Sequence, residues 1–185
     1  MWPQYILDHF ARIPDNTTIE NKYYGVYNTI LDRECFNTAQ FTVQPQYALP
    51  NAQTPGIPPV DFLVTYVVEV NDLPVFFLEI KPPNHREHIS TRADADQQIR
   101  ERFRSLYDLV LIPRLHGISV MGQQLAFYCL HKPSGLVTPE YVAPSAVRLT
   151  DTAPKARWDV DVTTEEGYQR FMEVVEYVKQ MTLAL

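Results

Sequence analysis

The segment from Pro59 to Lys81 reads PVDFLVTYVVEVNDLPVFFLEIK and carries the pattern of a buried β-hairpin. Val, Ile, Phe and Tyr dominate two runs within it, and the polar pair Asn71-Asp72 separates the runs. β-branched and aromatic residues favour strands, whereas Asn and Asp favour turns. We therefore predict two antiparallel strands that share a short turn and form the centre of the fold.

Three charged residues interrupt this apolar pattern. Asp61 lies at the entry of the first strand, and Glu79 and Lys81 lie at the exit of the second. The start of one antiparallel strand and the end of the next are neighbours, and residues two apart on a strand point to the same face. The spacing thus predicts that two carboxylates and one ammonium group meet at a single edge of the sheet.

The register of the hairpin determines whether Asp61 shares a face with Glu79. Cross-strand partners share a face, so the two carboxylates meet only when the numbers of paired residues add up to an even total. A strict two-residue turn at Asn71-Asp72 gives an odd total, so we predict a three-residue loop or a β-bulge. In that register the opposite face is wholly apolar and contains Phe62, Val64, Tyr66, Val68, Phe76, Leu78 and Ile80.

Two carboxylates at a strand edge are suited to a hard divalent cation. Mg²⁺ prefers oxygen ligands, uses one or two carboxylates and keeps several waters in its octahedral shell. A lysine beside such an ion can position or deprotonate a water molecule, or stabilise the charge that develops on a phosphate. The alternative is that Glu79 and Lys81 form an ordinary surface ion pair and that Asp61 is a turn residue.

Residues 60–62 (VDF), followed by residues 78–81 (LEIK), resemble the signature of the PD-(D/E)XK nuclease superfamily. The resemblance covers roughly residues 17–131, and Pro59 stands two places before Asp61 instead of immediately before it. It implies an α/β fold with the restriction-endonuclease-like α-β-β-β-α-β core, in which helices flank a central mixed sheet. It also implies a metal-dependent phosphodiesterase, a nuclease that hydrolyses DNA or RNA.

The resemblance assigns roles to the residues at the strand edge. It implies that Mg²⁺ or Mn²⁺ lies between Asp61, Glu79 and the carbonyl group of Ile80, and that Lys81 orients the attacking water. The pattern over residues 98–128 is in addition similar to that of a group of uncharacterised fungal proteins. The sequence does not determine whether the substrate is single- or double-stranded. It also leaves the oligomeric state open between a monomer and other states such as a homodimer.

Two further site residues come from the neighbouring helices. Gln98, with Gln97 as the alternate, matches a glutamine that serves the active site in the RecB-like branch of the superfamily. The tyrosine that accompanies it in that branch is absent, because Arg102 stands four residues on. Glu20 matches an acidic residue that many members carry on the helix before the sheet, but it equally completes a capping box that begins at Thr17.

The other elements follow from periodicity, caps and breakers. We predict helices at residues 3–12, 17–35, 90–109 and 163–181, strands at 41–49, 117–121 and 125–130, a loop at 50–59 and an extended or looping segment at 132–160. Up to residue 130 the order is helix, three strands, helix, strand, which agrees with the core that the resemblance implies. The apolar face of the last helix is expected to dock on the sheet.

The composition is that of a soluble globular protein, with 185 residues, 45% hydrophobic and 21% charged. We predict a single nuclease-like domain over residues 1–185 with a sizeable core. Cys35 and Cys129 lack framework spacing, which favours a reduced intracellular compartment, cytoplasm or nucleus. No apolar run reaches transmembrane length, so no membrane partner is expected.

The charged residues leave two classes of function open. Candidates for contacts with the phosphates of a nucleic acid partner are Arg86, Arg92, Arg100 and Arg102. His85 and His88 have no cysteine or third histidine nearby, so we predict a solvated loop there and no zinc site. The net charge of −6 and the missing tyrosine favour a catalytically silent module that uses the same fold to bind nucleic acid or a protein. The joint presence of Asp61, Glu79 and Lys81 favours the enzyme.

Overall fold

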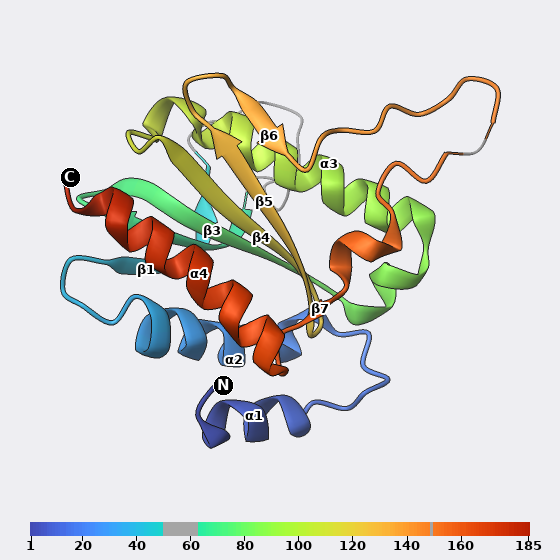
Figure 1. Ribbon diagram of the computed structural model, residues 1–185. Coiled ribbons are helices and arrows are strands. Elements are labelled where there is room, and N and C mark those ends of the chain that lie inside the picture. The colour runs from blue at the N-terminus through green and yellow to red at the C-terminus, as the bar shows by residue number, and fades with distance from the viewer. Residues whose placement is uncertain (50–62, 149) are drawn as a thin grey trace.

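The computed structural model describes residues 1–49, 63–148 and 150–185 and shows an α/β fold built on one sheet (Figure 1). The α-helices are α1 (Gln4–Ala11), α2 (Tyr24–Thr29), α3 (Ile89–Leu106) and α4 (Glu165–Thr182). The strands are β1 (Thr42–Ala48), β2 (Leu63–Val70), β3 (Leu73–Lys81), β4 (Arg114–Met121), β5 (Gln124–His131), β6 (Leu136–Thr138) and β7 (Val160–Asp161). Shorter helical segments are η1 (Glu20–Lys22), the π-helical η2 (Ile30–Cys35), η4 (Pro83–Glu87), η5 (Tyr107–Leu109) and η6 (Lys155–Trp158). The loop predicted at 50–59 lies outside the described residues.

The sheet is mixed, as the sequence predicted. Its strands follow the order β1-β2-β3-β4-β5-β6, and β7 pairs with β5. The pairs are antiparallel except for β3 and β4, which are parallel. A parallel pair needs a crossover connection, and α3 lies in that connection. The α/β class is confirmed, and so is the order helix, three strands, helix, strand.

The β2–β3 hairpin contains the β-bulge that its charge pattern predicted. Asn71 and Asp72 form a tight turn in which both have positive φ angles, 53° and 63°. The register shifts at Val68, and beyond the shift the paired numbers have an even total, as for Tyr66 with Leu78. A two-residue turn is thus combined with a bulge. The predicted bulge is confirmed, and the alternative of a three-residue loop is wrong.

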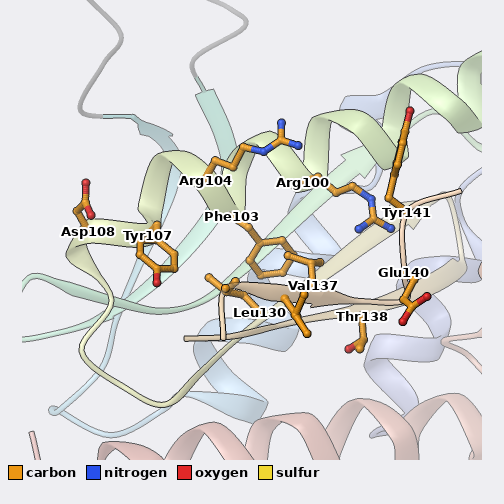
Figure 2. Close-up of a pocket in the computed structure, with 12 residues that line it drawn as sticks. Arg100, Phe103, Arg104, Tyr107, Asp108, Leu130, Val137, Thr138, Glu140 and Tyr141 are labelled. Carbon is orange, nitrogen blue, oxygen red and sulfur yellow. The ribbon is translucent and has the colours of Figure 1, made fainter. Parts of the chain in front are cut away.

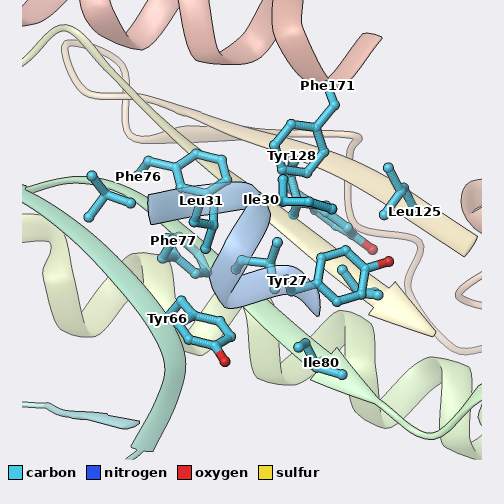
Figure 3. Close-up of a cluster of buried hydrophobic side chains, with 14 of the residues drawn as sticks. Tyr27, Ile30, Leu31, Tyr66, Phe76, Phe77, Ile80, Leu125, Tyr128 and Phe171 are labelled. Atoms are coloured by element: carbon cyan, nitrogen blue, oxygen red, sulfur yellow. The ribbon is translucent and has the colours of Figure 1, made fainter. Parts of the chain in front are cut away.

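Different helices cover the two faces of the sheet. α3 covers one face, where Phe77 of β3 packs edge-on against Phe103 with ring centroids 4.8 Å apart. The other face carries α2, η2 and α4, and there Phe76 lies against Phe36 and Phe171 (Figure 3). Because neighbouring residues of β3 pack against opposite layers, the alternation predicted for this strand is confirmed.

The helix predicted to open with a capping box at residues 163–166 is capped one residue later, at Thr164, and the cap predicted at residue 17 is absent. Thr164 caps α4, since its hydroxyl accepts a hydrogen bond from the Gly167 N–H (3.1 Å). The capping box predicted at Thr17 is wrong. Its hydroxyl accepts from the Ile19 N–H (3.2 Å) within a turn, and the helical segment begins only at Glu20.

Residues 1–49, 63–148 and 150–185 contain no helix that is long and apolar enough to cross a membrane. Cys35 and Cys129 are both free thiols. Burial is the main cause that raises the pKa of each, so both thiols stay protonated at neutral pH.

Gly117 offers a test of how tightly β4 packs below α3. A Cβ atom at this position would lie 2.5 Å from Cζ of Phe77. We expect Gly117→Ala to lower the free energy of unfolding by about 1–3 kcal/mol, because the ring has to shift within a filled layer. Gly25→Ala is the matched control, since a Cβ there meets open space on α2, and it should raise stability by about 0.5–1 kcal/mol. Equal denaturation midpoints for the two variants would contradict the packing.

Candidate functional site

Glu79 lies near the carboxyl end of β3, and two side chains hold its carboxylate there. Its side chain is buried, with 4% of the residue surface exposed. Oε1 accepts a hydrogen bond from Nε of Arg102 (2.7 Å), and Oε2 accepts from the hydroxyl of Thr65 (3.2 Å). The same hydroxyl accepts from the Ile80 N–H (3.2 Å). The carboxylate is therefore fixed in one orientation by β2 and by α3.

Arg102 forms a buried ion pair with Glu79. It comes from α3, and only 3% of its side chain is exposed. It stands four residues after Gln98, where the sequence comparison expected a tyrosine. The prediction that Arg102 contacts phosphate is wrong, because its guanidinium group lies inside the fold.

Two more of the predicted phosphate contacts are also buried. Arg92 pairs with Asp151 (2.6 Å), and Arg100 pairs with Asp96 (2.9 Å). The fourth, Arg86, is half-buried and donates to the carbonyl oxygen of Trp158 (2.6 Å). These partners belong to α3 itself or to the chain after β6, which returns to cover the helix.

Lys81 follows Glu79 by two positions on β3, so the two side chains start from the same face. It is half-buried, and its ammonium group makes no ion pair or hydrogen bond with any residue that the structure describes. His85, in η4, lies within its electrostatic reach. Burial is the largest cause that lowers the pKa of His85, and the charge of Lys81 lowers that pKa further.

Two tyrosines, Tyr24 and Tyr66, connect Glu20 to this edge of the sheet by hydrogen bonds. Its carboxylate accepts a short hydrogen bond from the hydroxyl of Tyr24 and does not cap its own helix. The Tyr66 hydroxyl donates to the carbonyl oxygen of Tyr24 (2.7 Å), which ties η1 and α2 to β2. Burial mainly raises the pKa of Tyr24, and the charges of Glu20 and Glu79 raise it further. Both carboxylates therefore act on the same tyrosine.

Gln98 and Gln97 lie in different environments on α3. Gln98 is half-buried and lies four residues before Arg102, on the same flank of the helix. Gln97 is exposed and donates to Glu101 (2.8 Å) along the helix surface. Of the two glutamines, Gln98 shares the flank of Arg102, and its part in a site stays a prediction.

A complete metal centre is not formed by the described residues. Within them, no group of three or more His, Cys, Asp and Glu side chains is placed to hold an ion, and His85 and His88 form no such group. Asp61 lies outside these residues. Coordination by Asp61, Glu79 and the Ile80 carbonyl therefore stays a prediction.

Comparison of the chain with models of protein families, with characterised proteins and with solved structures gives no match. The chemistry of this edge must accordingly be inferred from its own side chains. They are an anchored carboxylate, an ammonium group beside it, and a second carboxylate on the approaching helical segment.

A second polar cluster, which the sequence did not predict, lies on the other flank of α3. Asp96 is buried and accepts hydrogen bonds from Arg100, from Arg157 and from the hydroxyl of Tyr128 (2.8 Å). The spacing of Asp96 and Arg100 along the helix was a usable signal. No sequence pattern near Asp96 predicts its contact with Arg157, because Arg157 is 61 residues away in sequence.

The Glu79–Arg102 pair can be tested by removing its cation. Arg102→Met leaves a buried carboxylate with a single hydroxyl partner, and we expect a loss of about 3–5 kcal/mol in the free energy of unfolding, measured with urea. Arg104→Met is the control, because Arg104 is exposed and has no partner in the described part of the chain; its effect should stay within about 0.5 kcal/mol. Adding Glu79→Gln to Arg102→Met should recover part of the loss. Equal midpoints for Arg102→Met and Arg104→Met would show that the pair does not stabilise the fold.

Proposed function

We propose that this chain is a metal-dependent phosphodiesterase that hydrolyses DNA or RNA, on a restriction-endonuclease-like α-β-β-β-α-β core. The observation that carries the proposal is the edge at the end of β3. There a rigidly held carboxylate, Glu79, precedes an ammonium group, Lys81, that has no anionic partner among the described residues. In open α/β sheets the carboxyl ends of parallel strands are where ligands bind, and β3 pairs in parallel with β4.

The residues present fit a divalent cation in one respect. A carboxylate has about four lone-pair positions, and Arg102 and Thr65 occupy one on each oxygen of Glu79, so acceptor capacity remains. Glu79, Asp61 and the Ile80 carbonyl would hold Mg²⁺ or Mn²⁺, which when bound supplies Lewis-acid activation of the phosphate and of water.

The remaining roles belong to side chains around that edge. Lys81 orients the attacking water and stabilises the charge that develops on the phosphoryl oxygens. Glu20 adds negative charge from the approaching segment, and Gln98 donates from the flank of α3.

The second candidate function is a catalytically silent module of the same fold that binds nucleic acid or a protein. One observation favours it: the guanidinium group of Arg102 already balances the charge of Glu79, as a metal ion would. Arg92 and Arg102 are also unavailable to a phosphate at this edge, because both are buried in internal ion pairs, and Arg100 lies on the opposite flank of α3.

Cleavage assays separate the two functions. Purified protein is incubated with single- and double-stranded DNA and RNA in Mg²⁺ or Mn²⁺, beside Glu79→Ala, Lys81→Ala and the control Lys155→Ala. Lys155 is exposed and pairs with Glu87 at the surface, so its removal should leave cleavage unchanged. We expect wild type to cut at least one substrate and a chelator to stop it. Lys81→Ala should lose about 10²-fold or more, because the water loses its orienting group.

The outcomes assign the function. If the protein cuts none of the substrates but still binds nucleic acid, the silent module replaces the enzyme as the proposed function. Equal cutting by wild type, Glu79→Ala and Lys81→Ala would trace the activity to a contaminant and remove the support for a nuclease.

Metal binding can be measured without turnover. Millimolar Mn²⁺ or Mg²⁺ should raise the melting temperature of wild type, since an ion at 100 times its Kd stabilises the folded state by about 2.7 kcal/mol. Asp61→Asn should lose most of this shift because a charged ligand is removed, whereas Lys81→Ala should keep it. An equal shift in wild type and Asp61→Asn would locate the ion elsewhere.

A further inference from the structure

A cavity of about 540 Å³ lies on the flank of α3 that faces away from the Glu79 edge (Figure 2). Arg100, Arg104 and Tyr107 line it from α3 and η5, whereas Gln98 and Arg102 belong to the opposite flank. Its volume falls in the usual range for small-molecule sites, about 300–1,000 Å³. The helix separates it from the proposed hydrolytic site.

The lower part of the cavity is apolar, and aromatic rings border it. Phe103 and Leu130 are buried, and Val137 of β6 is half-buried. Tyr107 and Tyr141 line the two ends, and Tyr141 remains 58% exposed. Rings above an apolar surface favour a flat ligand, because stacking adds to the burial of area.

Two guanidinium groups supply unfilled donors beside the rings. Nε and Nη2 of Arg100 donate to Asp96 (2.9 and 3.2 Å), and Nη2 also donates to the Pro139 carbonyl (2.6 Å). Nη1 has no partner among the described residues. Every fully buried side-chain nitrogen or oxygen atom in that part of the chain has a partner, so Nη1 keeps some exposed surface, although only 6% of the Arg100 surface is exposed. Arg104 is exposed, makes no ion pair there, and lines the same cavity.

The charge around these donors is positive. Asp96 is paired with two cations, Arg100 and Arg157, so this buried cluster carries one excess positive charge. A second, adjoining cavity of about 360 Å³ is lined by Gln97, Arg100, Arg104 and Tyr141. It provides room for a hydrated anionic group beside the apolar cavity.

The far end of the cavity carries an acid and no arginine, whereas the Arg100 end combines the positive charges of Arg100 and Arg104 with one carboxylate, that of Glu140. Figure 2 shows Asp108 beside Tyr107 at one end, and Arg100, Tyr141 and Glu140 at the other. Asp108 can accept a hydrogen bond from an amino group on a ring. The arrangement thus suits a molecule with an anion at one end and a donor at the other.

We propose that this cavity binds a planar aromatic molecule that carries one anionic group. The ring lies between Tyr107 and Tyr141, and the anion binds Arg104 and Nη1 of Arg100. Mononucleotides and free aromatic carboxylic acids share this chemistry, and both are small enough for the space. The proposal does not depend on nuclease activity.

Calorimetric titrations test the chemistry and its source. The probes are adenosine 5′-monophosphate, adenosine, ribose 5-phosphate and 4-aminobenzoate, all with chelator present. We expect saturable binding of the monophosphate or of 4-aminobenzoate. A preference for 4-aminobenzoate alone identifies a free aromatic acid as the source. If the monophosphate binds, adenosine and ribose 5-phosphate should each bind about tenfold more weakly, since each lacks one of the two recognised parts.

Variants locate the bound probe. Arg104→Ala should weaken the binding of the anionic probe about tenfold. Arg114→Ala, which removes an exposed arginine of β4 outside the cavity, should not. Val137→Phe should fill the cavity and abolish binding, and Lys81→Ala should leave it unchanged. Failure of both anionic probes to bind at millimolar concentration, or binding that survives both Arg104→Ala and Val137→Phe, would overturn the proposal.

Discussion

The buried ion pair between Glu79 and Arg102 joins the centre of the sheet to its crossover helix. Removing two charges from water is costly, and their attraction offsets that cost only when geometry is good and the remaining polar atoms are satisfied. Thr65 meets the second condition, because its hydroxyl links the other oxygen of Glu79 to the backbone of β3. The pair therefore sets the rotation of α3. Once Arg102 points at β3, Gln98 must share its flank and Arg100 must face the opposite way.

Arginine side chains of α3 hold the segment between β6 and η6 against the helix. Arg92 binds Asp151 and the carbonyl oxygen of Ala153 (2.9 Å), and Arg100 binds the carbonyl of Pro139. These contacts fix the segment between β6 and η6 against the helix. They also take positive charge away from the surface, since the chain has 16 lysines and arginines in all and several are internal. Glu69, Glu79 and Asp96 are buried as well, so among the described residues burial removes as much negative charge from the surface as positive charge.

The sequence predicted what depends on neighbours along the chain. The alternation in β3 and the place of the turn predict a three-residue loop or a bulge, because side-chain direction changes with every residue, and the structure has the bulge. Partners far apart in sequence could not be predicted. The sequence predicts that Arg102 contacts phosphate, because nothing near Arg102 in sequence shows that Glu79 faces it across the helix–sheet interface. For Glu20 the sequence predicts either a cap, from the local Thr-x-x-Glu pattern, or an acidic site residue; the structure rules out the cap, because the Tyr24 hydroxyl bonds its carboxylate.

The same ion pair bears on whether the edge can hold a metal. One carboxylate balanced by one guanidinium group gives no net negative charge, so Glu79 by itself offers little attraction to a divalent cation. Net attraction has to come from other acids at the edge, and Asp61 and Glu20 are the ones that the sequence provides. Glu79 would then orient the bound ion more than attract it, because Thr65 and Arg102 keep the oxygens of Glu79 in place. Lys81 lies beside Glu79, whose charge Arg102 already balances. The positive charge of Lys81 therefore favours an added anion, such as a phosphate, over an added cation.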